Sequence, residues 1–147
     1  MPMGLFGPSP KQRREIARNN LHETVSFLEK CKKDLGELAK PDKCWDDGHT
    51  NRFLELFRNA EICMVRSEEE ATKINDKQLV ANIERVRKFL EGKRKWFESA
   101  HGEARSKSFT AFLKEYWPEY EGYLEEMGIV LENSISGIKL ILAKNLW

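Results

Sequence analysis

Histidine and glutamate side chains at helical spacing are the first candidates for chemistry in this chain, because such pairs hold metal ions in helical bundles. Glu98 and His101 form a Glu-x-x-His step, which places both side chains on one face of a helix. A di-iron site needs two such steps and two further glutamates, and the sequence has no second step. His22 begins a sequence like a helical zinc motif, but Ser26 stands where the second histidine belongs. The sequence therefore predicts no metal ion and no cofactor.

Arg94 and His101 are a second candidate pair, with six residues between them. This spacing resembles the Arg-x(4–6)-His element of HEPN-domain ribonucleases, an all-helical family of similar length that usually dimerises. The resemblance implies that the two side chains polarise an RNA phosphate and move the proton of the 2′-hydroxyl during cleavage. Lys95 follows the arginine, where the family generally has a residue such as Asn, Asp or His. An RNA-cleaving helical dimer that uses Arg94 and His101 is therefore one alternative function.

Positive charge gathers around the same arginine. Residues 76–107 carry nine Lys or Arg against five Asp or Glu, whereas residues 108–147 carry three against six. Lys93, Arg94 and Lys95 lead directly into a tryptophan, and basic residues beside an aromatic ring can bind phosphates and stack on bases. This pattern gives a second alternative, a peripheral binder of anionic membrane or nucleic acid through a basic helix. In the other interpretation, these charges form the solvated face of a helix or pair with the acidic segment.

The aromatic run over residues 109–123 is the third feature that could bind a partner. Most of its members fall near one face of a helix, and stripes of this kind are mostly core. Tyrosine and tryptophan also dominate interface hot spots, so we expect part of the run to form a groove for a protein partner. Trp45 lies in a polar loop predicted over residues 41–50. We expect it to pack back onto the bundle as a lid, and an exposed anchor for a partner is the alternative. The candidate partner-binding residues are Tyr116, Trp117, Tyr120 and Tyr123 of the run, Trp45 of the loop, and Ile141 and Trp147 near the C-terminus.

The first helix has a sharp start and a sharp end in the sequence. Ser9 and Gln12 form a capping box around a proline, which fits the first position of a helix. Apolar residues at spacings of three, four and seven then continue, which predicts a helix over residues 10–40. A proline follows, and the composition of residues 41–50 predicts a loop.

The later elements become shorter toward the C-terminus. A second helix is expected to end near Asn75, where the register of apolar residues changes, and a third is expected to end at Gly102. Pro118 and Gly128 then divide the remainder into short helical pieces, and a last amphipathic helix begins near Leu131.

These elements predict an all-α fold, a helical bundle of three long helices plus a shorter, kinked helical C-terminal third. Residues 1–8 are expected to be a flexible tail, and residues 9–147 a single domain. The tail contains an apolar tip at residues 4–7 that precedes basic residues and could touch an anionic membrane. The sequence contains no alternating pattern typical of a strand and no apolar run long enough to cross a bilayer.

Composition narrows the class of protein and its compartment. The chain has 147 residues, 33% of them charged, and a formal net charge of only +1, which argues against a protein built mainly to coat nucleic acid. Cys31, Cys44 and Cys63 lie far apart, as free thiols of a cytoplasmic protein would. No catalytic constellation is present, and the aromatic run and the C-terminal helix carry more apolar residues than one buried flank needs. The sequence therefore predicts a small non-enzymatic helical-bundle protein that serves as a protein–protein interaction module. Self-association through the C-terminal helix is the related hypothesis.

Overall fold

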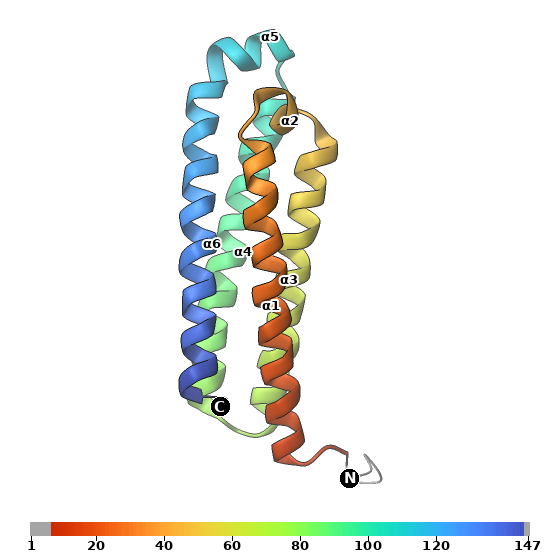
Figure 1. Cartoon of the computed structure of the whole chain (residues 1–147), viewed down its shortest axis with the longest axis vertical. Coiled ribbons are helices and arrows are strands. Elements are labelled where there is room, and N and C mark those ends of the chain that lie inside the picture. The colour runs from red at the N-terminus through yellow and green to blue at the C-terminus, as the bar shows by residue number, and fades with distance from the viewer. Residues whose placement is uncertain (1–6, 146–147) are drawn as a thin grey trace.

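Four long helices form an antiparallel bundle in the computed structural model, which describes residues 7–145 (Figure 1). They are α1 (Pro10–Leu38), α3 (Asp47–Lys73), α4 (Lys77–Arg105) and α6 (Trp117–Asn145). The chain runs up and down the bundle in turn, so each long helix is antiparallel to the one before it (Figure 1). No strand occurs within residues 7–145, and the predicted all-α class is confirmed. None of the described helices is both long and apolar enough to cross a lipid bilayer.

Three short helical pieces lie at the end of the bundle away from the chain termini (Figure 1). They are α2 (Pro41–Trp45), α5 (Phe109–Ala111) and the π-helical turn η1 (Phe112–Tyr116). The loop predicted over residues 41–50 is therefore wrong, because α2 and the first turn of α3 occupy most of it. Pro41 occupies the first turn of α2, where its missing N–H is not needed. A helix of five residues is too short for apolar periodicity to reveal.

Local capping interactions fix the start of α1 and the break between α3 and α4. Ser9 N–H donates to Oε1 of Gln12 at 2.8 Å, and Gln12 N–H donates to Oγ of Ser9 at 3.2 Å, which confirms the predicted capping box. The predicted break at Asn75 is also confirmed, and this residue has a φ of 56°, a left-handed conformation that asparagine tolerates well. Asp76 then caps α4, because its carboxylate accepts from Leu79 N–H at 3.1 Å.

The C-terminal third is more continuous than the sequence indicated, since α6 alone extends over 29 residues. Pro118 lies in the first turn of α6, directly after the π-helical turn η1, and the chain stays helical without a gap from Phe109 through the proline. The widened turn is the local departure from the α-helix at this point. Gly128 does not end the helix, because buried residues on both sides of it hold α6 against the bundle. A Cβ at Gly128 would lie 3.5 Å from Cδ2 of Leu35 in α1. The end predicted at Gly102 is also passed, since α4 continues to Arg105.

Aromatic rings from three of the long helices pack together in the core. The rings of Phe53 in α3 and Phe97 in α4 have centroids 5.5 Å apart, and Phe97 lies 5.8 Å from Tyr120 of α6. All three side chains are completely buried, as is Phe112 of η1, whose ring lies 5.7 Å from Tyr120. These contacts link α3 to α4 and α4 to α6, and they help to determine which side of α6 is left facing outward.

Candidate functional site

The aromatic run that the sequence analysis assigned to partner binding is largely part of the core. Tyr116 and Tyr120 are buried, and the hydroxyl of Tyr116 donates to the carbonyl of Ala100 at 3.3 Å. Burial raises the pKa of both tyrosines. Trp117 and Tyr123 are half-buried and pack against the same core. The run therefore does not form an open groove, because the rings that would line such a groove fill the inside of the bundle. Ile141, another candidate for partner binding, is buried. Trp147 lies outside the described residues, as do residues 4–6 of the N-terminal tip.

Trp45 packs back onto the end of the bundle as a lid. Its Nε1 donates to the carbonyls of Ala104 at 3.1 Å and Lys107 at 3.3 Å. The guanidinium of Arg105 lies 4.3 Å from the centre of its ring, and the ring of Phe109 packs against it edge-on at 5.4 Å. The polar and apolar parts of the side chain are thus engaged within the chain, which leaves Trp45 little freedom to anchor a partner.

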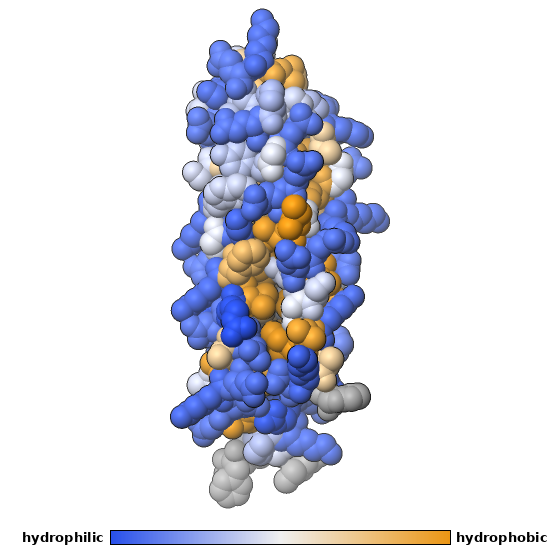
Figure 2. All heavy atoms as spheres, turned by 90° about the vertical axis from the view of Figure 1, so that its left-hand side faces the viewer, coloured by the Kyte–Doolittle hydropathy of each residue, from blue (hydrophilic) through white to orange (hydrophobic). Residues whose placement is uncertain are grey.

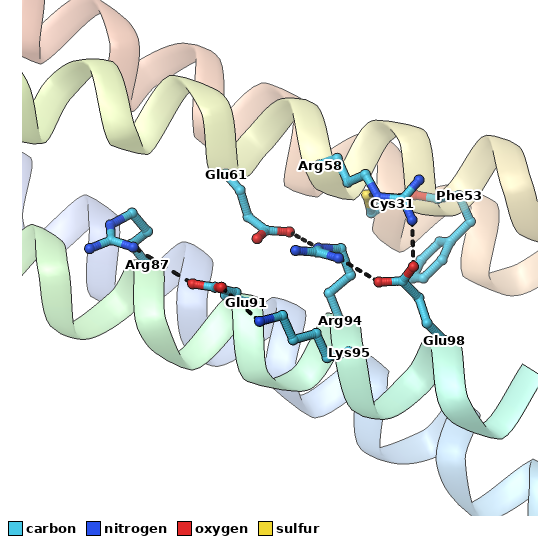
Figure 3. A network of polar contacts seen from close by, with 9 residues as sticks. All are labelled: Cys31, Phe53, Arg58, Glu61, Arg87, Glu91, Arg94, Lys95 and Glu98. Atoms are coloured by element: carbon cyan, nitrogen blue, oxygen red, sulfur yellow. Dashed lines mark hydrogen bonds and ion pairs between the residues drawn. The ribbon is translucent and has the colours of Figure 1, made fainter.

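Arg94 faces α3 and is held between two carboxylates (Figure 3). Its Nε donates to Glu61 of α3 at 2.6 Å, and its Nη1 donates to Glu98 one turn further along α4. Arg58 of α3 also binds Glu98, so two arginines and two glutamates alternate across the α3–α4 seam. Burial raises the pKa of Glu61, although the hydrogen bond and charge of Arg94 oppose this effect. Binding of a phosphate at Arg94 would therefore require existing ion pairs to break.

His101 lies on the same side of α4, two helical turns beyond Arg94, and is buried. Its Nε2 lies 2.9 Å from Oδ1 of Asp47 at the start of α3. Arg105 Nε binds the same carboxylate oxygen at 3.3 Å. The two residues of the HEPN-like element thus share one face of α4, but that face is turned toward α3. Arg94 lines a groove of about 490 Å³ along α3, but its guanidinium is bound to two carboxylates, and His101 is buried. The ribonuclease hypothesis remains a prediction without a structural observation in its favour.

Lys93, Arg94 and Lys95 point in different directions and do not form one basic patch. Successive residues on a helix are about 100° apart, and each of the three has its own acidic partner. Lys93 binds Glu126 of α6 at 3.0 Å, and Lys95 binds Glu91 of α4 at 3.0 Å. The Lys93–Glu126 contact is an ion pair between the basic segment and the acidic C-terminal segment. Such pairing within the bundle is one of the interpretations that the sequence left open.

The cysteines are buried as free thiols and lack the character of nucleophiles. Burial raises the pKa of Cys31 and of Cys44 to about 12, and it also raises the pKa of Cys63. Because their pKa values are raised, these side chains stay protonated at neutral pH. The thiolate is the reactive form, so they are poor nucleophiles. Within residues 7–145, no group of three or more His, Cys, Asp or Glu side chains is placed to hold a metal ion.

Large apolar side chains are exposed on the side of the bundle formed by α4 and α6. Ile129 and Leu140 of α6 are 61% and 54% exposed, and Phe89 of α4 is 43% exposed. Ile129 and Leu140 are close to three turns apart, so they lie in one line along α6, with the exposed Asn133 and Ser136 between them. We call these five residues the α4–α6 face. Figure 2 shows this side of the molecule, where apolar groups lie along the middle and lower part of a largely hydrophilic surface.

Phe89 is joined to α6 through its neighbour Lys93. The ammonium group of Lys93 lies 5.9 Å from the centre of the Phe89 ring while it binds Glu126 of α6. A groove of about 610 Å³ between α4 and α6 continues from the α4–α6 face, and Leu140 forms part of its wall. Arg85 is among the residues that line this groove, and none of them is acidic.

Phe89 and Ile129 are not among the residues predicted from the sequence, and near the C-terminus the exposed residue is the neighbour of the one predicted. Ile141 is part of the core, whereas the adjacent Leu140 faces outward. Phe89 likewise stands beside Leu90, which is completely buried. These two share one feature: each is an apolar residue directly before a core position. Adjacent residues on a helix point about 100° apart, so one of them can face outward while the other is buried.

Comparison of the chain with protein-family models, with curated proteins and with solved structures finds no match.

Proposed function

We propose that this chain is a non-enzymatic helical-bundle protein that binds another protein through the α4–α6 face. The observation that carries the proposal is the exposure of Phe89, Ile129 and Leu140 on one side of the bundle. Single apolar residues are common on protein surfaces, but several that are aligned on one face mark sites of association. The polar groups between them, Asn133 and Ser136, are uncharged, as is common at the centre of protein interfaces.

The ion pairs of Arg94 and His101, the candidate catalytic pair, support a protein without catalytic activity. Arg94 binds Glu61 and Glu98, and His101 binds Asp47, so both side chains already stabilise the packing of α4 on α3. A general base or a phosphate-binding arginine must reach its substrate, and here both face a neighbouring helix.

We also propose that binding takes place in the cytoplasm. The three cysteines are free thiols, each buried in the bundle, which supports a compartment where thiols stay reduced.

Photo-crosslinking tests the binding function directly. A benzoylphenylalanine in place of Phe89 keeps an aromatic ring at the centre of the α4–α6 face, and the same residue in place of Leu113, which is 38% exposed in η1, is the matched control. We expect a discrete protein adduct from position 89, its loss when Leu140→Glu is added, and no such adduct from position 113. Adducts of equal yield from both positions, or none from position 89, would contradict the proposal.

A further inference from the structure

We propose that the partner bound at the α4–α6 face is an acidic amphipathic helix, which continues into the groove beside Leu140 and places carboxylates on Arg85 and Lys144. This inference rests on the proposed function and names the chemistry of the partner at the same face. The charges along the seam between α4 and α6 and the spacing of its apolar residues support it.

Two cations line the groove without an acidic partner in the bundle. Arg85 of α4 and Lys144 of α6 are both exposed, and neither forms an ion pair with a residue of the described chain. Lys93, further along the same seam, is by contrast bound to Glu126 at 3.0 Å. The other polar side chains that line the groove are uncharged amides. The groove therefore carries positive charge only, and it is complementary to carboxylates.

The charge of α6 changes sign along its length. Residues 117–132 carry five glutamates and no Lys or Arg, whereas residues 133–145 carry two lysines and no Asp or Glu. A flat anionic surface such as a membrane, laid along the outer side of α6, would meet the glutamates as well as the lysines. A helix seated in the groove, where α4 begins and α6 ends (Figure 1), meets the cations alone. The distribution favours an acidic segment of a protein over an anionic bilayer.

The two cations are spaced to meet two carboxylates of one helix. Val86 of α4 lies level with Gly137 of α6, because a Cβ on the glycine would be 3.7 Å from Cγ2 of the valine. Arg85 is thus near the level of Gly137, and Lys144 lies seven residues beyond that level, which is about 10 Å. Carboxylates about two turns apart on a bound helix have this separation, and they flank its apolar side, one toward α4 and one toward α6.

The apolar residues of the face continue the same line. Leu140 lines the groove, and Ile129 lies eleven residues before it, about 16 Å along α6, with Phe89 of α4 exposed on the same side. A helix of about 15 residues covers the whole stretch from Ile129 to Lys144. Amphipathic helices bind grooves between helices by apolar residues that recur every three to four positions. The partner segment is therefore apolar on one side and acidic at the end that enters the groove.

Photo-crosslinking from position 89 tests the charge of the natural partner. Arg85→Glu combined with Lys144→Glu should lower the adduct yield at least tenfold, because like charges then face one another. An adduct whose yield this double reversal leaves unchanged would overturn the proposal. Circular dichroism must show that the variant keeps its helical content, as expected for two exposed side chains without ion pairs to described residues.

Lys139→Glu is the matched control for the double reversal. This lysine is also exposed in the second half of α6 and forms no ion pair with a described residue. It lies about two turns beyond Glu132, which binds Lys32 of α1, so it is on the side of α6 that faces α1. We expect Lys139→Glu to leave the adduct yield at the wild-type level, and a loss equal to that of the double reversal would overturn the proposed placement.

A display library of helical peptides measures the charge preference directly. Each peptide has about 18 residues, with leucines at the apolar positions and Glu, Gln or Lys at the flanking ones. Selection on the purified full chain should enrich Glu at flanking positions about two turns apart. Selection on the Arg85→Glu, Lys144→Glu variant should enrich Lys at the same positions, an exchange that a merely structural effect does not produce. No enriched helix, or the same preference on both proteins, would overturn the proposal.

The other occupants of this face give distinct results. Binding of the chain to vesicles of phosphatidylserine and phosphatidylcholine, lost in Leu140→Glu, would assign the face to a membrane and overturn the proposal. A dimer in sedimentation velocity that Leu140→Glu abolishes would assign the face to a second copy and overturn it as well.

Failure of the acidic helix is separable from failure of the proposed function. An adduct from position 89 that resists the double reversal but disappears in Leu140→Glu would refute the acidic helix and leave binding through the α4–α6 face standing. No adduct from position 89, together with no enriched helix in the library, would refute both.

Discussion

Removal of the Arg94 side chain probes whether this residue stabilises the bundle or performs chemistry. Arg94→Met keeps most of the apolar length of the side chain but removes the guanidinium that binds Glu61 and Glu98. Glu98 retains Arg58 as a partner, so Glu61 is the carboxylate that loses its principal ion pair. The perturbation is therefore one carboxylate left without its partner between two packed helices.

The expected loss of stability follows from the burial of this pair. The side chains of Arg94 and Glu61 are only 16% and 11% exposed. Breaking a buried pair by removing one partner costs about 3–5 kcal/mol, and the residual exposure places this site at about 3 kcal/mol. Replacing both residues, as in Arg94→Met with Glu61→Leu, removes the stranded charge, so the double variant should lie within about 1 kcal/mol of the wild type.

Urea unfolding followed by circular dichroism measures these differences. With a slope of about 2 kcal/mol per molar urea, Arg94→Met should lower the midpoint by about 1.5 M. Arg52→Met is the control, since it breaks the ion pair with Asp34 in which the arginine is largely exposed, and it should cost less than about 1 kcal/mol. A loss below about 1 kcal/mol for Arg94→Met would refute the structural role. An unchanged midpoint together with lost RNA cleavage would support the ribonuclease hypothesis instead.

Three further predictions concern pH, packing and thiol reactivity. Because the raised pKa of Glu61 makes the folded chain bind its proton more tightly than the unfolded chain, its contribution to the free energy of unfolding declines as the pH rises above about 4.5. Glu61→Gln should remove this decline, and urea unfolding at a series of pH values would reveal an unchanged profile if the reasoning is wrong. Phe97→Ala should cost about 3–5 kcal/mol in the same assay, because this ring is completely buried in the aromatic core, and a loss below about 1.5 kcal/mol would contradict the packing described. A disulfide reagent at about pH 8 should label Cys63 first and should reach Cys31 and Cys44 only on global unfolding, since burial holds both pKa values at about 12; rapid labelling of the folded chain at either of these two would oppose this.

The sequence by itself determined the helical class, the start of α1 and the break between α3 and α4, because these depend on local interactions. The capping box of Ser9 and Gln12 and the change of register at Asn75 act within a few residues of the chain, and both appear in the structure as expected. Apolar residues at helical spacing likewise report which side of a helix is buried, since one side must leave water.

Tertiary structure decided what local patterns could not. Pro118 and Gly128 carry local signals for a break, yet packing against α1 and α4 holds α6 together through both. The partners of Arg94 and His101 come mainly from α3, so their engagement cannot be read from the spacing on α4 alone. Which of two adjacent apolar residues faces outward, such as Leu140, depends on the rotation of α6 about its own axis. The neighbouring helices and their aromatic core fix that rotation, and it creates the surface through which we propose that this protein acts.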